Sequence, residues 1–329
     1  MALFLAYNLL AFGLQPLFGL GVDRAGRPRE AAVFGALLVA AALALSLAPA
    51  SILVATVAAG LGNALFHVGG GAISIGLTPG GASAPGVFVA PGAAGLAAGT
   101  LLARTGGPVW ALAVALAALS LGLLAMPRRA LAARPIQVAS DSADTGSLRL
   151  SEGAELAVGI VLVVIMLRSF TGFAIVLPWR SSLTLLGWLT AAIVAGKALG
   201  GVLADRFGRV RVGVGSLVIS APLLVAAAQS PVAGVLGMLA FNMTMAVTLV
   251  AIADTLPEQP AFAFGLASFA LVVGALPVLL GIPVGLRTSG PIVTAVAVAA
   301  ALLALALVWL NEGTHHRAPQ RTSLVEVSE

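Results

Sequence analysis

Long apolar runs, separated by short polar, proline-containing or glycine-rich breaks, extend along almost the whole chain. As helices, these runs are long enough to cross a hydrocarbon core of about 30 Å, which takes about 20 residues. A membrane barrel would instead need segments of about ten residues with alternating polarity, and this pattern is not seen. We therefore expect about eleven transmembrane helices. They are predicted at residues 2–22, 31–49, 52–77, 84–103, 108–126, 154–177, 183–204, 211–229, 231–253, 262–285 and 290–310.

A polar stretch divides these spans into two groups. Residues 127–153 contain four arginines, several acids and a Ser/Asp/Thr/Gly run, which is the composition of a linker. We expect a helical bundle of five spans in residues 1–126, a cytoplasmic linker at 127–153 and a bundle of six spans in 154–311. A polar cytoplasmic tail is expected at 312–329. The predicted class is an all-α integral membrane protein.

Composition excludes the main soluble classes. Of the 329 residues 60% are hydrophobic and 9% are charged, whereas soluble domains carry about 25% charged residues. The sequence has no cysteine, and it contains no phosphate-binding loop, Ser/His/Asp ordering or metal-ligand cluster. We expect no enzyme activity, no cofactor, no metal and no nucleic-acid partner.

The positive charges predict the orientation, because cytoplasmic loops of membrane proteins are enriched in Lys and Arg. If the first loop is cytoplasmic, alternating spans place twelve of the 17 Lys and Arg residues inside and three outside. The other two, Arg168 and Lys197, fall within spans. This bias predicts a multi-pass protein of the inner or plasma membrane with a cytoplasmic C-terminus. Eleven spans then place the N-terminus outside, although no polar segment precedes the first span.

The strongest local signal is a repeated loop. Residues 19–29 and residues 201–211 both read G-x-x-x-D-R-x-G-R-x-R, 182 residues apart, and both join two apolar spans. Glycine permits close helix approach, the aspartate can accept charge-assisted hydrogen bonds at a helix end, and the arginines suit the cytoplasmic headgroups. Two independent basic turns would explain the arginines but not the matched Gly and Asp.

This loop resembles the signature between the second and third helices of each half of the major facilitator superfamily. The resemblance covers residues 1–311 and implies two pseudo-repeated bundles with a substrate site at their interface. It also implies that the first span here is the family's second helix and that the family's first helix is absent. Either the true start lies upstream or this is a natural eleven-span variant. The resemblance also implies that the loop residues form a cytoplasmic gating latch. They are Gly19, Asp23, Arg24, Gly26 and Arg27 in the first copy and Gly201, Asp205, Arg206, Gly208 and Arg209 in the second.

Two further segments resemble fosmidomycin-resistance-type members of that superfamily. One is residues 60–71, where Asn63 and a Phe-His pair that includes His67 sit among glycines, and the other is residues 168–172. This resemblance favours export as the direction of transport.

Ionisable groups inside spans are costly, so they are candidates for function. Arg168 is near mid-depth and is interpreted as an anchor for an anionic substrate. The alternatives are a structural ion pair and a bond to backbone carbonyls. Lys197 could line the site or extend toward the cytoplasmic interface. His67 could relay protons or bind substrate, or it could be a packing residue. Asn63 and Asn242 could bind polar substrate groups or join helices.

The leading hypothesis is a secondary transporter that moves a small organic molecule, with an anion as the candidate class, through the lipid bilayer by alternating access, with protons as a candidate coupling ion. The alternatives are a transport-incompetent truncated or scaffold-like membrane protein and a lipid flippase on the same fold.

Overall fold

The computed structural model describes residues 2–48, 51–125, 152–284 and 289–315, and every element in these ranges is helical. Ten helical stretches are long and apolar enough to cross a membrane, and a shorter apolar helix covers Trp110–Ala125. These correspond in order to the eleven predicted spans. Most of the predicted linker and tail lies outside the described residues.

The N-terminal helices form five spans. The elements in order are α1 (Ala2–Asn8), the π-helix η1 (Leu9–Gly13), α2 (Gln15–Ala25), α3 (Pro28–Leu45), α4 (Ile52–Leu77), α5 (Ser83–Val89), α6 (Pro91–Thr105) and α7 (Val109–Ala125). The first span is thus one irregular helix built from α1, η1 and α2. The fourth span breaks at Ala90, because Pro91 has no N–H to continue the helix of α5.

The C-terminal helices form the other six spans. They are α9 (Glu152–Ala174), η3 (Pro178–Ser181), α10 (Leu183–Phe207), α11 (Arg209–Val225), η4 (Ala226–Ala228), α12 (Pro231–Asn242), α13 (Thr244–Thr255), α14 (Pro260–Leu279) and α15 (Ser289–His315). The span of α12 and α13 is interrupted at Met243.

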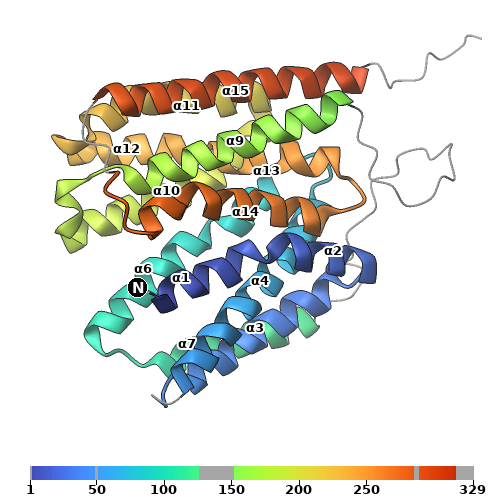
Figure 1. Cartoon of the computed structure of the whole chain (residues 1–329), viewed down its shortest axis with the longest axis vertical. Coiled ribbons are helices and arrows are strands. Elements are labelled where there is room, and N and C mark those ends of the chain that lie inside the picture. The colour runs from blue at the N-terminus through green and yellow to red at the C-terminus, as the bar shows by residue number, and fades with distance from the viewer. Residues whose placement is uncertain (1, 49–50, 126–151, 285–288, 316–329) are drawn as a thin grey trace, which may run out of the picture.

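Helices pack mainly with others of their own half. In the N-terminal half α3 packs against α4 and α7, and in the C-terminal half α9 and α11 pack against α15. In Figure 1 the helices after residue 151 lie above those before residue 126, and α14 runs beside α2 where the two sets meet. The other main contact between the sets is made by α10 with α5 and α6.

Small and apolar side chains fill the interior, whereas large apolar side chains cover the outside. The largest buried cluster includes Val161, Leu217, Ile252 and Leu303. On the outer surface Leu17, Leu96 and Val232 are each at least two-thirds exposed. Such an apolar exterior would be unfavourable in water and suits contact with lipid.

Candidate functional site

The repeated loops make matched contacts between the two halves. In the first copy, the carboxylate of Asp23 near the C-terminal end of α2 accepts hydrogen bonds from the backbone N–H groups of Ala261 (3.0 Å) and Phe262 (2.8 Å). These N–H groups belong to the first turn of α14, whose own N-cap side chain makes no capping bond. A carboxylate at this position satisfies two orphan donors and interacts favourably with the helix dipole.

The second copy repeats this arrangement with the halves exchanged. The carboxylate of Asp205, near the end of α10, accepts hydrogen bonds from the backbone N–H groups of Ala82 (2.6 Å) and Ser83 (2.9 Å) at the start of α5. Each half thus provides one aspartate that binds the start of a helix in the other half. Gly26 and Gly208, which follow the two aspartates, end their helices with φ values of 62° and 93°, a region that favours glycine.

Glycines allow the backbones to touch beneath both aspartates. A β-carbon on Gly19 would lie 2.5 Å from the carbonyl oxygen of Ala261, and one on Gly201 would overlap the carbonyl oxygen of Ala82. The signature glycine is therefore required for close approach to the other half in both copies.

A third pair of contacts extends the match toward the interior. A β-carbon on Gly265 of α14 would lie 2.6 Å from the carbonyl oxygen of Gln15, and one on Gly86 of α5 would lie 2.8 Å from that of Lys197. Lys197 follows Gln15 by 182 residues, the offset of the repeated loop, and Gly265 follows Gly86 by 179. We call the contacts of α2 with α14 the first junction and those of α10 with α5 the second junction.

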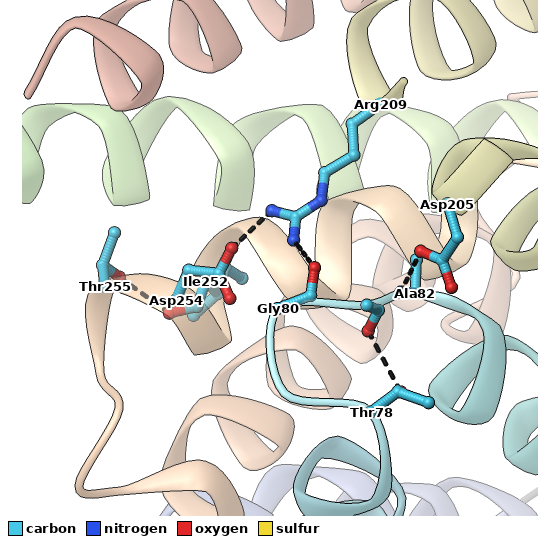
Figure 2. Close-up of polar contacts among 9 residues, drawn as sticks. Thr78, Gly80, Ala82, Asp205, Arg209, Ile252, Asp254 and Thr255 are labelled. Carbon is cyan, nitrogen blue, oxygen red and sulfur yellow. Dashed lines mark hydrogen bonds and ion pairs between the residues drawn. The ribbon is translucent and has the colours of Figure 1, made fainter. Parts of the chain in front are cut away.

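The second junction carries an extra charged contact. Figure 2 shows the guanidinium of Arg209 between the carboxylate of Asp254 and the carbonyl oxygen of Gly80, to both of which it donates. The other signature arginines, Arg24, Arg27 and Arg206, are exposed. All four were predicted to belong to one latch. Among the residues that the structure describes, Arg209 is the only one of the four that bridges the two halves by a hydrogen bond.

Arg168 of α9 is buried, with 5% of its surface exposed. Its Nη2 donates to the carbonyl oxygen of Phe241 at 3.0 Å, and its guanidinium carbon lies 5.2 Å from the centre of the Phe241 ring. Its Nε is buried and has no hydrogen-bond partner. A bond to a backbone carbonyl was one of the alternatives considered from the sequence, and it leaves part of the guanidinium unsatisfied.

A small cavity lies beside Arg168 where the two halves meet. It is lined by Val89 from α5 and by residues of α9, α13 and α14, including Thr248, Phe264 and Ser268. Its volume is about 20 Å³, which suits a water molecule and not an organic substrate. In this conformation the space next to Arg168 is therefore too small for an organic substrate.

His67 lies among aromatic rings from four different helices. Its Nδ1 is 2.9 Å from the carbonyl oxygen of Asn63. The rings of Phe12, Phe66, Phe88 and Phe264 lie with their centroids 5.6–6.4 Å from that of His67. Since Phe264 also lines the cavity beside Arg168, the histidine and the arginine approach the same part of the interface.

Lys197 of α10 is partly buried and lies near both other basic groups. It lies within electrostatic range of both His67 and Arg168. The structure thus brings together three of the predicted site residues. The predicted site residue Asn242 donates a hydrogen bond to the carbonyl oxygen of Met238 in its own helix. Asn63, the other predicted asparagine, lies 179 residues before Asn242 and is partly buried on α4.

Acidic residues are placed differently from the basic ones. All those whose side chains are described lie in terminal helical turns or connecting loops: Asp23, Glu30, Glu155, Asp205, Asp254 and Glu258. Within the same ranges no cluster of His and acidic residues could hold a metal ion. The interior of the described chain is therefore positively charged.

Gln15 was not among the site residues predicted from the sequence. This residue is 0% exposed, its Nε2 donates to the carbonyl oxygen of Ala11 at 2.7 Å, and its Oε1 has no hydrogen-bond partner. The available signal was the repeat, because Gln15 occupies in the first copy the place that Lys197 occupies in the second. An uncharged amide is easily overlooked in a search for ionisable groups.

The fold is that of major facilitator superfamily transporters. The chain is similar to crystal structures of the E. coli fucose:proton symporter FucP, with a TM-score of 0.61, 14% identity and coverage of 93% of this chain and 88% of the other. A structure of FucP in the outward conformation gives a TM-score of 0.62, 13% identity and coverage of 93% and 89%. For the crystal structure of the human organic anion transporter MFSD10 (TETRAN), the TM-score is 0.60 and the identity is 18%, and the match covers 94% of this chain and 82% of the other.

No family model and no curated protein matches the sequence. The comparisons therefore confirm the predicted fold class, an all-helical membrane protein of the major facilitator type. The similarity to fosmidomycin-resistance-type members and the absence of the first helix stay predictions.

Proposed function

We propose that this protein is a secondary transporter that carries a small organic anion across the inner or plasma membrane by alternating access. The observation that carries the proposal is Arg168, a buried cation with an unpartnered Nε beside a cavity where the two halves meet. The fold supports the transporter class, and one structural neighbour is named as an organic anion transporter.

Charge complementarity supports the choice of an anion. Lys197 lies within electrostatic range of both Arg168 and His67, and the described acids lie near helix ends. Charges attract more strongly in a low-dielectric interior than in water, so an unbalanced group of cations there favours a negatively charged ligand. A guanidinium also matches carboxylate, phosphonate and phosphate oxygens in geometry.

The two junctions are proposed to act as the gate. Both are formed in this structure, and the proposal is that they close the end of the molecule that carries Asp23 and Asp205. The arginine distribution supports a cytoplasmic location for this end and for the C-terminus. Opening both junctions would expose the cationic group to that side. The proposed direction is export, based on the fosmidomycin-type resemblance, and a proton is the proposed coupling ion, with His67 as its carrier.

Ligand-dependent stabilisation tests the anion specificity. Binding to the native state raises apparent stability by RT ln(1 + [L]/Kd). We expect lactate, methylphosphonate or both to raise the unfolding temperature of the purified protein, and we expect tetraphenylphosphonium to have no such effect. Arg168→Met should abolish the anion effect. The matched control is Arg180→Met, which removes an exposed arginine of η3.

Transport then tests the activity. Proteoliposomes that contain the wild-type protein should accumulate the stabilising anion when a proton gradient drives the transport. Arg168→Met should reduce the rate of this uptake at least tenfold. Transport by Arg168→Met at the wild-type rate, or stabilisation by the organic cation alone, would contradict the proposal.

A further inference from the structure

Gln15 and Lys197 occupy equivalent places on opposite sides of the interface. Each contributes a backbone carbonyl that contacts a glycine of the other half, Gly265 for Gln15 and Gly86 for Lys197. Each lies eight residues before the aspartate of its junction, or about 12 Å along a helix. The two residues therefore lie at the same depth relative to the two aspartates.

The amide of Gln15 has a fixed orientation. Its Nε2 donates to the carbonyl oxygen of Ala11, which lies in the π-helix η1. Rotating the amide by half a turn would bring two oxygens together, so Oε1 is the atom left without a partner. A buried acceptor without a donor costs free energy, and π-helical turns occur frequently at functional sites. Gln15 Oε1 is therefore free to accept a hydrogen bond from a donor that a ligand brings.

On the basis of the proposed function, we propose that Gln15 binds substrate opposite Lys197 and that the substrate is an anion with a hydroxyl or amide N–H group near its charge. The anionic group would face the Arg168 and Lys197 side, and the donor would face Gln15 Oε1. A substrate ammonium could also donate to an amide oxygen. It would be repelled by the two cations, however, so a neutral donor is favoured.

This pairing assigns selectivity to Gln15. A buried site that hydrogen-bonds a substrate hydroxyl rejects the analogue that lacks it, because the acceptor is then left unpaired. Arg168 and Lys197 would bind both compounds through the shared anionic group. Removing the acceptor should therefore abolish the preference for the hydroxylated compound without abolishing anion binding.

Matched ligand pairs test the proposal. Dissociation constants of lactate and propionate, and of hydroxymethylphosphonate and ethylphosphonate, would be measured by thermal stabilisation of the purified full chain. The wild-type protein is expected to bind at least one hydroxylated compound tenfold or more tightly than its partner. In Gln15→Met the difference should fall below about twofold, while the affinity for the compound without the hydroxyl stays within about threefold. The control Gln229→Met changes an exposed glutamine and should keep the preference.

An exchange of the two residues provides a second test that does not depend on Gln15→Met being stable. Gln15→Lys alone should weaken binding of the hydroxylated anion at least tenfold. Combining it with Lys197→Gln should restore most of that loss, because the two positions again hold one acceptor and one cation.

The outcomes separate this inference from the proposed function. If anions bind through Arg168 but without preference for hydroxylated compounds, or if Gln15→Met keeps that preference, the proposed role of Gln15 is wrong. The proposed transport of an anion would still stand. If the exchange variant binds no better than Gln15→Lys alone, the equivalence of the two positions is wrong. If the wild-type protein binds none of these anions, the proposed function fails and this inference fails with it.

Discussion

The two junctions have the same backbone plan and different surroundings. In each, an aspartate binds the first N–H groups of a helix in the other half, a signature glycine touches a backbone carbonyl, and a second glycine receives the carbonyl of Gln15 or Lys197. Asp23 of the first junction is half-buried, whereas Asp205 of the second is exposed. The repeat has therefore preserved the backbone contacts while their solvent exposure has diverged.

The ion pair of Arg209 with Asp254 is particular to the second junction. Among the described residues, the one that precedes Asp254 by 179 positions is Ile75, which is buried, so the equivalent place beside the first junction carries no acid. A half-buried aspartate is screened less by water and gains more from each hydrogen bond than an exposed one. Burial in the first junction and an added ion pair in the second are two ways of holding the same closed end.

The chain has no cysteine, so the two junctions can be observed separately. Ala261 of the first junction and Ala82 of the second are both fully buried and 179 residues apart. A single cysteine at either position would react with a maleimide only when its junction opens. We call a cysteine at position 261 the reporter of the first junction and a cysteine at position 82 the reporter of the second junction.

The largest effect is expected from Asp23→Ala. This variant removes two charge-assisted hydrogen bonds from a half-buried position, which we expect to cost the first junction roughly 3 kcal/mol. Maleimide labelling at its reporter should then rise about 100-fold, since each 1.4 kcal/mol corresponds to about a factor of ten. Asp205→Ala should raise labelling at the second reporter about tenfold, because water can replace part of the hydrogen bonding that an exposed carboxylate provides to the N–H groups. If Asp205→Ala opens its junction as widely as Asp23→Ala does, the burial argument is wrong.

A smaller effect is expected from crowding the backbone contact. In Gly201→Ala the new β-carbon would overlap the carbonyl oxygen of Ala82, and two main chains cannot move apart as easily as a side chain can rotate. We expect a loss of roughly 2 kcal/mol in unfolding free energy. The control is Gly21→Ala in α2, which has open space at its β-carbon and should be neutral or slightly stabilising. Thermal unfolding in detergent measures both, and equal unfolding temperatures for the two variants would contradict the need for close approach.

Much of the fold could be predicted from the sequence because its determinants are local. Apolar length, proline positions and the arginine distribution predict the spans, and the repeated loop points to the superfamily. The partners of Asp23 could not be predicted in this way. They are backbone N–H groups of Ala261 and Phe262, more than 230 residues away, and no side chain identifies them.

The candidate site was predictable only in part for a similar reason. Depth within a span identifies Arg168, Lys197 and His67 as unusual, and the structure brings them together. Nothing in the local sequence marks Gln15, because its significance depends on a contact with Gly265 and on an unpartnered oxygen. The second repeat offset of 179 is equally hidden, since it rests on a few Asn, Ala and Gly identities.

The smallest effect is expected from the ion pair that distinguishes the junctions. The side chains of Arg209 and Asp254 are 25% and 34% exposed, and pairs of this kind contribute about 0.2–1 kcal/mol. Asp254→Asn should raise labelling at the second reporter at most about threefold and leave the first reporter unchanged. The increase should disappear in 0.5 M NaCl, where screening weakens exposed pairs. It should also disappear in an Arg209→Met background, because the carboxylate then has no cation to lose. A tenfold increase that persists in salt would instead make this ion pair, and not the aspartate hydrogen bonds, the main restraint on the second junction.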